Sequence, residues 1–174
     1  SLRRGSLNAA LLRAATELAP DGLTIEVATL RDIPLYDGDA ERADGLPGAV
    51  RELKERIAAA DGLLLATPEY NHSIPGVFKN AIDWLSRPPK DIGRVFGGKP
   101  VGLVGATPGR GGTRLAQLAW LPVLRALGTR PFFGPPLHVD GAAAHFDEAL
   151  RLVDAGTRER LGAYLEGFAA FVAG

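Results

Sequence analysis

The sequence lacks cysteine and methionine entirely among its 174 residues. Without cysteine the chain has no disulfide, no thiolate nucleophile and no cysteine-bound zinc or iron–sulfur cluster, so a redox role would require a bound organic cofactor. No apolar run approaches the roughly 20 residues of a membrane-spanning helix, and no signal-peptide pattern opens the chain. We therefore expect a cytoplasmic protein that does not enter a membrane.

The chain also has no net charge, because its 20 basic residues balance its 20 acidic residues. A neutral chain has no strong field to attract nucleic acid or an anionic membrane surface, so neither is an expected partner. The length and the 46% hydrophobic content fit one globular domain over residues 1–174, with no linker or repeat. Since open reading frames start with methionine, its absence predicts that further residues precede Ser1.

The stretch from Leu63 to Pro88 is the most informative part of the chain. Leu63–Ala66 is a short apolar run without polar alternation, which is typical of a strand buried on both faces of a parallel sheet. Pro68 then takes the chain out of the sheet, and we expect Ser73 to cap a helix that carries Pro75 in its first turn. Open α/β sheets bind ligands where such a strand, loop and helix start meet.

The same stretch resembles the NADPH-dependent FMN reductase family, which includes flavodoxin-like quinone, chromate and azo reductases and carries a TPEYN loop followed by an IPG…KNAIDW helix. The resemblance implies an α/β three-layer sandwich with a five-stranded parallel sheet in the order 2-1-3-4-5. It also implies that the loop contacts the isoalloxazine ring of FMN, largely through backbone groups. The residues concerned are Pro68, Glu69, Tyr70, Asn71 and the following Ser73. The alternative is a strand-to-helix connection without a ligand.

A hydroxyl- and arginine-containing segment, Ser1–Ser6, precedes a predicted helix in which apolar residues recur from Leu7 to Leu18. Amides at a helix N-terminus suit an anion, and nearby side chains can add donors around a phosphate. An ordinary capped helix would look similar. The family's phosphate loop reads GSLR..S.N, and the resemblance therefore assigns the FMN phosphate to Ser1, Arg3, Ser6, Leu7 and Asn8. The strand that feeds this loop in the family would lie upstream of Ser1, and we expect it in the full protein.

The segment between the first and second predicted helices is mostly extended or irregular. Leu23–Leu30 alternates as an edge strand does, and the acidic run from Asp37 to Asp44 is expected to be a solvated loop, since it lacks the ligand spacing of a calcium site. Tyr36 lies in a segment resembling the family's active-site mouth, but a loop aromatic explains it equally well. A helix from Pro47 to Ala60 is predicted to bury Val50, Leu53, Lys54 and Ile57.

A second buried strand, Val101–Ala106, leads into a glycine-rich loop and a helix over Thr113–Leu127 that Pro122 should kink. Glycine-rich turns are common, so this loop alone is a weak signal for phosphate. In the family the loop borders the flavin ring and the nicotinamide site, which adds Ala106, Thr107, Gly109 and Gly112 to the candidate cofactor-binding residues. Arg130–Phe133 and Leu137–Val139 suit a sheet edge, and helices are expected over Phe146–Val153 and Thr157–Val172.

Three other interpretations are weaker. A hydrolase could use Ser73, His72 and Asp83, but no GxSxG elbow is present. His138 and His145 lack metal-ligand spacing, so no metal site is expected. A non-enzymatic FMN electron carrier is the serious rival, although such carriers dock through strongly acidic faces and this chain is neutral.

The resemblance implies an oxidoreductase that passes electrons from NADPH or NADH to quinones, flavins, azo compounds or metal oxyanions in a ping-pong cycle. The chemistry would take place on FMN N5, without a catalytic side chain. The family is dimeric or tetrameric, so a homodimer or homotetramer is expected. Phe78, Trp84 and Leu85 could be core residues or could make the subunit contact.

Overall fold

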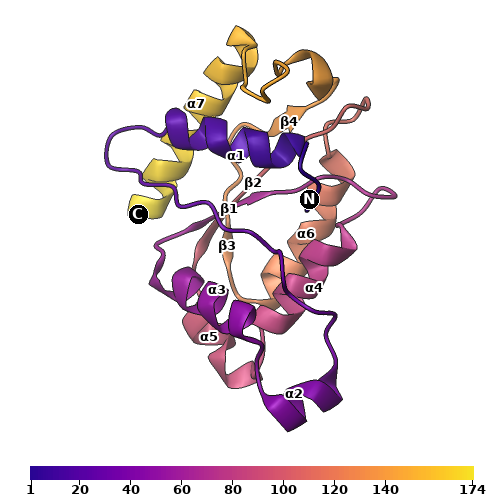
Figure 1. Ribbon diagram of the computed structural model, residues 1–174. Coiled ribbons are helices and arrows are strands. Elements are labelled where there is room, and N and C mark those ends of the chain that lie inside the picture. The colour runs from indigo at the N-terminus through magenta and orange to yellow at the C-terminus, as the bar shows by residue number, and fades with distance from the viewer.

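A parallel β-sheet lies between two layers of helices in the computed structural model, which describes residues 1–174 (Figure 1). The strands are β1 (Leu63–Ala66), β2 (Pro100–Ala106), β3 (Arg130–Pro131) and β4 (Leu137–Val139). β2 is central: β1 pairs with one side, while β3 and β4 pair with the start and the end of its other side. The predicted edge position of the last two strands is confirmed, and the proline-containing segment 132–136 separates them.

Seven α-helices surround the sheet. They are α1 (Leu7–Glu17), α2 (Gly38–Asp44), α3 (Gly48–Ala59), α4 (Gly76–Leu85), α5 (Ile92–Val95), α6 (Arg114–Ala126) and α7 (Ala155–Ala173). α1 and α7 cover one face of the sheet, α3, α4 and α6 cover the other, and α2 projects away from the body (Figure 1). None of these helices combines the length and the apolar character needed to cross a membrane.

The four residues of β1 alternate between two separate hydrophobic cores. Leu64 and Ala66 pack with α1 and α7, whereas Leu63 and Leu65 pack with α3, α4 and α6. A strand with helices on both faces has no solvent side, which is why its sequence is apolar throughout. Each large side chain buried in such a core stabilises the fold by about 1.5–3 kcal/mol. The predicted doubly buried strand is confirmed.

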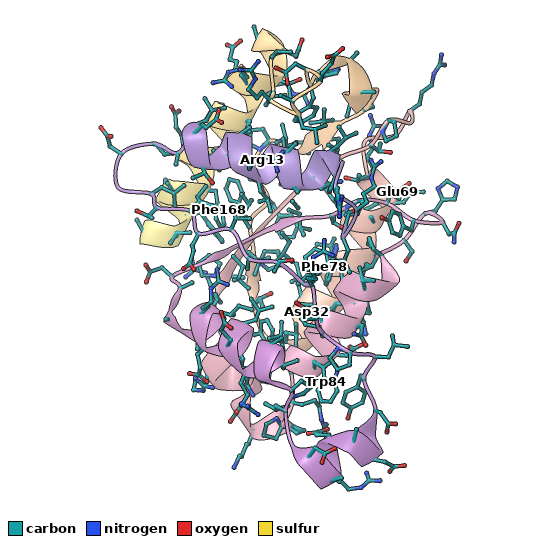
Figure 2. All side chains as sticks on the ribbon, in the orientation of Figure 1. Arg13, Asp32, Glu69, Phe78, Trp84 and Phe168 are labelled. Atoms are coloured by element: carbon teal, nitrogen blue, oxygen red, sulfur yellow. The ribbon has the colours of Figure 1, made fainter.

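Glycine in β2 allows α7 to lie close to the sheet. A Cβ on Gly102 would come 2.8 Å from the Tyr164 hydroxyl and 3.3 Å from Phe168, both on α7. Phe168 lies between this helix and the sheet in Figure 2. Any larger residue at position 102 would push the helix away from its core.

The predicted edge strand over Leu23–Leu30 is wrong. β1 pairs with β2 and with no other strand, and residues 24–30 make no backbone–backbone hydrogen bond. An alternating sequence becomes a strand only when a neighbour supplies hydrogen-bond partners, and this segment has none. Leu23 and Ile25 still pack against the α1 and α7 side of the core.

Two predictions of helix position are also wrong. Ser73 does not cap α4, since the N-cap residue is Pro75 and Ser73 instead closes a tight turn with Tyr70. Phe146–Val153 is not a helix: Phe146 pairs with Leu152, and the Asp147 carboxylate accepts a hydrogen bond of 2.8 Å from the Arg151 amide. Local side-chain bonds of this kind compete with helix formation.

Three further segments differ from expectation. The acidic stretch forms α2, because the Asp37 carboxylate caps it by accepting from the Asp39 amide at 2.7 Å, although all residues of the helix remain at the surface. The connection after Pro88 contains a 3₁₀ turn and α5. α6 continues through Pro122, which lies on the exposed side, where water can bond the carbonyl that proline leaves free.

Candidate functional site

Three chain segments that are far apart in the sequence meet beyond the carboxyl ends of β1 and β2. They are the entrance to α1 (residues 1–6), the loop between β1 and α4 (residues 67–75) and the glycine-rich loop between β2 and α6 (residues 107–113). The Tyr70 hydroxyl lies 3.4 Å from the Ser1 hydroxyl, which joins the first two segments. The Glu69 carboxylate reaches the start of α6, which joins the second and third.

The entrance to α1 presents unused hydrogen-bond donors. Ser6 is the N-cap residue, and its hydroxyl oxygen accepts from the Ala9 amide at 3.2 Å. The backbone amides from Leu2 to Asn8 have no acceptor within the protein. Arg3 and Arg4 are exposed and form no ion pair with any carboxylate. Free amides, a positive helix end and guanidinium groups together suit a phosphate.

Asn8 has a structural partner that its sequence position does not reveal. Its side-chain nitrogen donates to the Ala106 carbonyl at 2.8 Å, and its side-chain oxygen accepts from the Ala106 amide at 3.0 Å. Both bonds are buried, and they fix the start of α1 to the end of β2. The Asn8 side chain is therefore occupied, and Leu7 is buried, so each has only its backbone amide to offer a ligand.

The loop between β1 and α4 contains a tight two-residue turn. Tyr70 and Ser73 exchange backbone hydrogen bonds of 3.2 and 3.0 Å, while Asn71 and His72 have φ angles of 50° and 60°. Consecutive left-handed residues define this type of hairpin turn, in which asparagine is favoured. Tyr70, Asn71 and Ser73 are exposed at its tip, whereas Pro68 is buried at its base.

The base of this loop is anchored in the core by Thr67. Its amide donates to the Val104 carbonyl at 2.9 Å, and its hydroxyl accepts from the Trp120 indole nitrogen at 3.2 Å. Neither Thr67 nor Trp120 exposes any surface. Sequence reasoning missed both residues, since a threonine and a tryptophan 53 positions apart give no local sign that they meet.

The glycine-rich loop passes closely over β2 and β4. A Cβ on Gly105 would overlap the Thr113 hydroxyl and come 2.5 Å from the Thr67 carbonyl, and a Cβ on Gly112 would come 2.7 Å from His138. The loop is held from the other side by the Ala142 amide, which donates to the Thr107 carbonyl at 2.9 Å, and by the Gly141 amide, which donates to the Gly109 carbonyl at 3.1 Å. Gly109 itself is exposed.

His138 lies beneath this loop, with a buried Nδ1 atom that has no hydrogen-bond partner. Burial lowers the pKa of His138, and the nearby positive charge of Arg114 lowers it further. The imidazole is therefore neutral at pH 7. No group of three or more acidic or histidine side chains is arranged to hold a metal ion.

Two side chains of the KNAIDW motif hold the preceding segment against α4. The Asn80 amide and the Trp84 indole both donate to the Pro34 carbonyl, at 2.8 and 2.9 Å. Tyr36 packs edge-on against Trp84 and donates to Glu41, as a loop aromatic with a satisfied hydroxyl does. Phe78, Trp84 and Leu85 are at most 9% exposed, which makes them core residues of one subunit (Figure 2).

The site thus combines free hydrogen-bond donors at the entrance to α1 with two hydrogen-bonded loops that follow the neighbouring strands. This arrangement fits FMN, whose phosphate would lie at α1 and whose ring would lie between the loops. The sequence-predicted residues fall in these segments, except Leu7 and Asn8 in the first turn of α1 and Ala106 at the end of β2. Sequence reasoning did not include Arg4 or Arg31, because an isolated arginine belongs to no recognisable pattern. The Arg31 guanidinium donates to the Leu2 carbonyl at 2.8 Å.

Comparisons with known proteins agree with this geometry. Residues 1–144 match the family model described as NADPH-dependent FMN reductase. The chain is 45% identical to an NAD(P)H-dependent FMN reductase of Pseudomonas aeruginosa over 99% of this chain and 91% of that protein. It is 37% identical to a 2-hydroxy-1,4-benzoquinone reductase of a Burkholderia species over 99% and 92% of the two chains.

Among solved structures, a flavoenzyme NAD(P)H:(acceptor) oxidoreductase from Paracoccus denitrificans superimposes with a TM-score of 0.88 and 33% identity. The match covers 99% of this chain and 93% of that one. The architecture is therefore an α/β fold with a parallel sheet and helices, which is consistent with a flavodoxin-like fold. The chain belongs to the NADPH-dependent FMN reductase family.

Proposed function

We propose that this protein is an FMN-dependent oxidoreductase that takes electrons from NADPH or NADH and delivers them to a small-molecule acceptor. The observation that carries the proposal is the row of unpartnered backbone amides from Leu2 to Asn8, in a segment where the Arg3 and Arg4 side chains also form no ion pair. Family membership supports the identity of the anion as the phosphate of FMN.

The residues divide into two groups by what they would hold. Ser1, Arg3 and the amides through Asn8 would hold the phosphate, with Ser6 shaping the helix entrance as its cap. Backbone groups of Pro68–Asn71 and of the loop from Ala106 to Gly112 would lie along the ring, with Ser73 at the end of the first loop. No residue needs to act as a catalytic acid or base in this arrangement.

Bound FMN supplies the redox chemistry by accepting electrons from the nicotinamide nucleotide and passing them to the acceptor. The protein's part is to hold the ring and leave one face open between the two loops. Nucleotide and acceptor would use the same open face in turn, which is a ping-pong cycle. Quinones are the best-supported acceptor class, since a benzoquinone reductase is among the relatives. Flavins, azo compounds and metal oxyanions remain further candidates.

We also propose a flavodoxin-like sheet of five strands in the order 2-1-3-4-5. In this order β1, β2 and the edge formed by β3 and β4 would be strands 3, 4 and 5, and strand 1 would pair with the free edge of β1. The free edge of β1 supports this order, because its backbone donors and acceptors are available to a further strand. We also propose a cytoplasmic location, where both nicotinamide nucleotides are present as co-substrates.

Exposed apolar residues support assembly into a homodimer or homotetramer. Val77 on α4 and Leu115 and Leu118 on α6 are 40%, 45% and 59% exposed. The two helices are neighbours, since Phe78 and Trp120 pack edge to face with ring centroids 4.8 Å apart. We therefore propose that the subunit contact involves these exposed side chains on α4 and α6.

The cofactor is tested by releasing it from the purified protein with denaturant and identifying it by chromatography. FMN is the expected result, because the site offers donors for one terminal phosphate and the sequence carries no dinucleotide fingerprint. Steady-state rates with NADPH and a quinone should then give parallel double-reciprocal lines. Recovery of FAD alone, or failure to take up FMN on reconstitution, would contradict the proposal.

A further inference from the structure

Glu69 connects the two loops that flank the proposed flavin ring. Its Oε2 atom accepts hydrogen bonds from the backbone amides of Leu115 and Ala116, at 2.9 and 3.1 Å, in the first turn of α6. Its side chain is only 17% exposed, although it belongs to a surface loop. In Figure 2 it lies beside the first turn of this helix. The carboxylate therefore acts as a cap supplied from a distant segment.

The loop that carries Glu69 has little else to fix its tip to α6. Its own hydrogen bonds close the turn between Tyr70 and Ser73, and Thr67 anchors only its base. The capping residue of α6, Thr113, has a left-handed φ of 68° and makes no side-chain cap bond. Glu69 thus satisfies the helix amides that Thr113 leaves open and positions its own loop by the same contact.

The two helix N-termini at this edge of the sheet differ in charge as a result. The N-terminus of α6 already holds an anion, the Glu69 carboxylate, while the amides at the entrance to α1 have no acceptor. A helix N-terminus attracts negative charge, and an internal carboxylate cancels that attraction. A phosphate is therefore directed to α1 and away from α6.

We propose that Glu69 is a positioning residue for the flavin: it locks the two ring-flanking loops together and places one fixed negative charge beside the ring. This inference rests on the proposed FMN function. Its Oε1 atom lies 3.4 Å from Nδ1 of His72, whose side chain is 81% exposed, so solvent weakens that contact and the backbone bonds provide the lock.

The test compares Glu69→Ala and Glu69→Gln with the wild type. Asp154→Asn is the matched control, because Asp154 caps α7 by accepting from the Thr157 amide at 2.7 Å. FMN affinity is measured by titrating the apo-protein, and the midpoint potential of the bound flavin is measured by anaerobic titration. Amide hydrogen exchange of the apo-protein reports the lock without any flavin.

Glu69→Ala should raise the FMN dissociation constant about tenfold, since it removes hydrogen bonds to a charged group. Glu69→Gln keeps a carbonyl acceptor and should recover part of that loss. Both variants should shift the flavin potential to a more positive value, because the added negative charge of reduction no longer faces a carboxylate. Exchange in the apo-protein of Glu69→Ala should accelerate at Leu115 and Ala116 and also at Tyr70 and Ser73. Asp154→Asn should change none of these quantities.

The proposal is overturned if both Glu69 variants keep the wild-type affinity and potential, with faster exchange confined to α6, because Glu69 is then only a helix cap. It is likewise overturned if Asp154→Asn changes the affinity as much as Glu69→Ala does. Failure of the wild-type protein to bind FMN would instead overturn the proposed function. The exchange data would then still show whether Glu69 locks the loops.

Discussion

Arg3 and Asn8 stand five positions apart at the entrance to α1, yet their side chains are in opposite situations. Arg3 is exposed and has no carboxylate partner, so its guanidinium is free to bind an anion. Asn8 is 4% exposed, and its side-chain amide forms two hydrogen bonds with the backbone of Ala106. Substitutions at Arg3 and at Asn8 should therefore affect anion binding and the stability of the fold separately.

Arg3→Ala should weaken FMN binding by roughly ten- to a hundredfold, because a charge-assisted hydrogen bond to phosphate contributes about 1.5–3 kcal/mol. The measurement is titration of apo-protein with FMN. Arg13→Ala is the control, since Arg13 is exposed on α1 and also lacks an ion-pair partner. Equal dissociation constants for wild type and Arg3→Ala would remove Arg3 from the phosphate site.

Asn8→Ala should lower the free energy of unfolding by about 2–4 kcal/mol, because it leaves the buried amide and carbonyl of Ala106 without partners. Urea unfolding of the apo-protein measures the change. Thr16→Ala provides the comparison on the same helix, where an exposed hydroxyl bonds the Leu12 carbonyl and the expected change is about 0.5 kcal/mol or less. A similar loss in the two variants would show that the Asn8 bonds add little to stability.

At the scale of elements, the sequence predicted those whose pattern is set by burial. Apolar residues recur at helical spacing in α1, α3 and α6, and β1 is apolar throughout. Lys54 lies on the buried side of α3, as predicted. The failures involve partners that a local pattern does not contain. Leu23–Leu30 alternates correctly but has no neighbouring strand, and Asp37 caps a helix where only solvated carboxylates were expected.

The candidate site shows the same division. The motif residues from Pro68 to Asn71 follow directly on β1, as the apolar run before them predicts. The bond from Glu69 to the Leu115 amide spans 46 residues and has no sequence signature. Which side chains are free and which are occupied, as with Arg3 and Asn8, is decided by packing that periodicity does not describe.

Lys54 joins α3 to the turn before α5, and this contact should be sensitive to acid. Its Nζ donates to Asp91 Oδ2 at 2.7 Å and to the Arg87 carbonyl. The bond to Asp91 is the main reason that the pKa of Asp91 is lowered. A carboxyl group with a lowered folded-state pKa adds stability above its unfolded pKa of about 4 and loses it as the pH falls through the folded value.

Lys54→Met should therefore lose less stability than the wild type when the pH is lowered from about 7 to about 3. Urea unfolding at both pH values measures the difference. Lys79→Met is the control, because its bond to Asp83 joins two half-exposed side chains within one helix. If Lys54→Met and the wild type lost the same free energy on acidification, Asp91 would not be the linked group.

At the scale of the whole molecule, the proposed subunit contact involves Val77 on α4 and Leu115 and Leu118 on α6, which are exposed. Leu118→Glu should shift the protein from the proposed dimer or tetramer toward the monomer mass of 18.3 kDa, because a buried charge without a partner opposes association. Light scattering coupled to size exclusion measures the mass. Val153→Glu alters a residue that is 56% exposed outside these helices and should leave the assembly intact. An unchanged mass for Leu118→Glu would place the interface elsewhere.

A reductase and an electron carrier differ in the source of their electrons. A reductase takes them directly from NADPH or NADH, whereas a carrier receives them from a separate reductase. The most direct test is to mix the FMN-loaded protein with NADPH, and separately with NADH, in an anaerobic stopped-flow instrument and follow the visible flavin absorbance. At least one nucleotide alone should bleach the flavin, and adding a quinone should restore the colour. A protein that stays yellow with both nucleotides until a separate reductase is added would be an electron carrier, and the proposed function would be wrong.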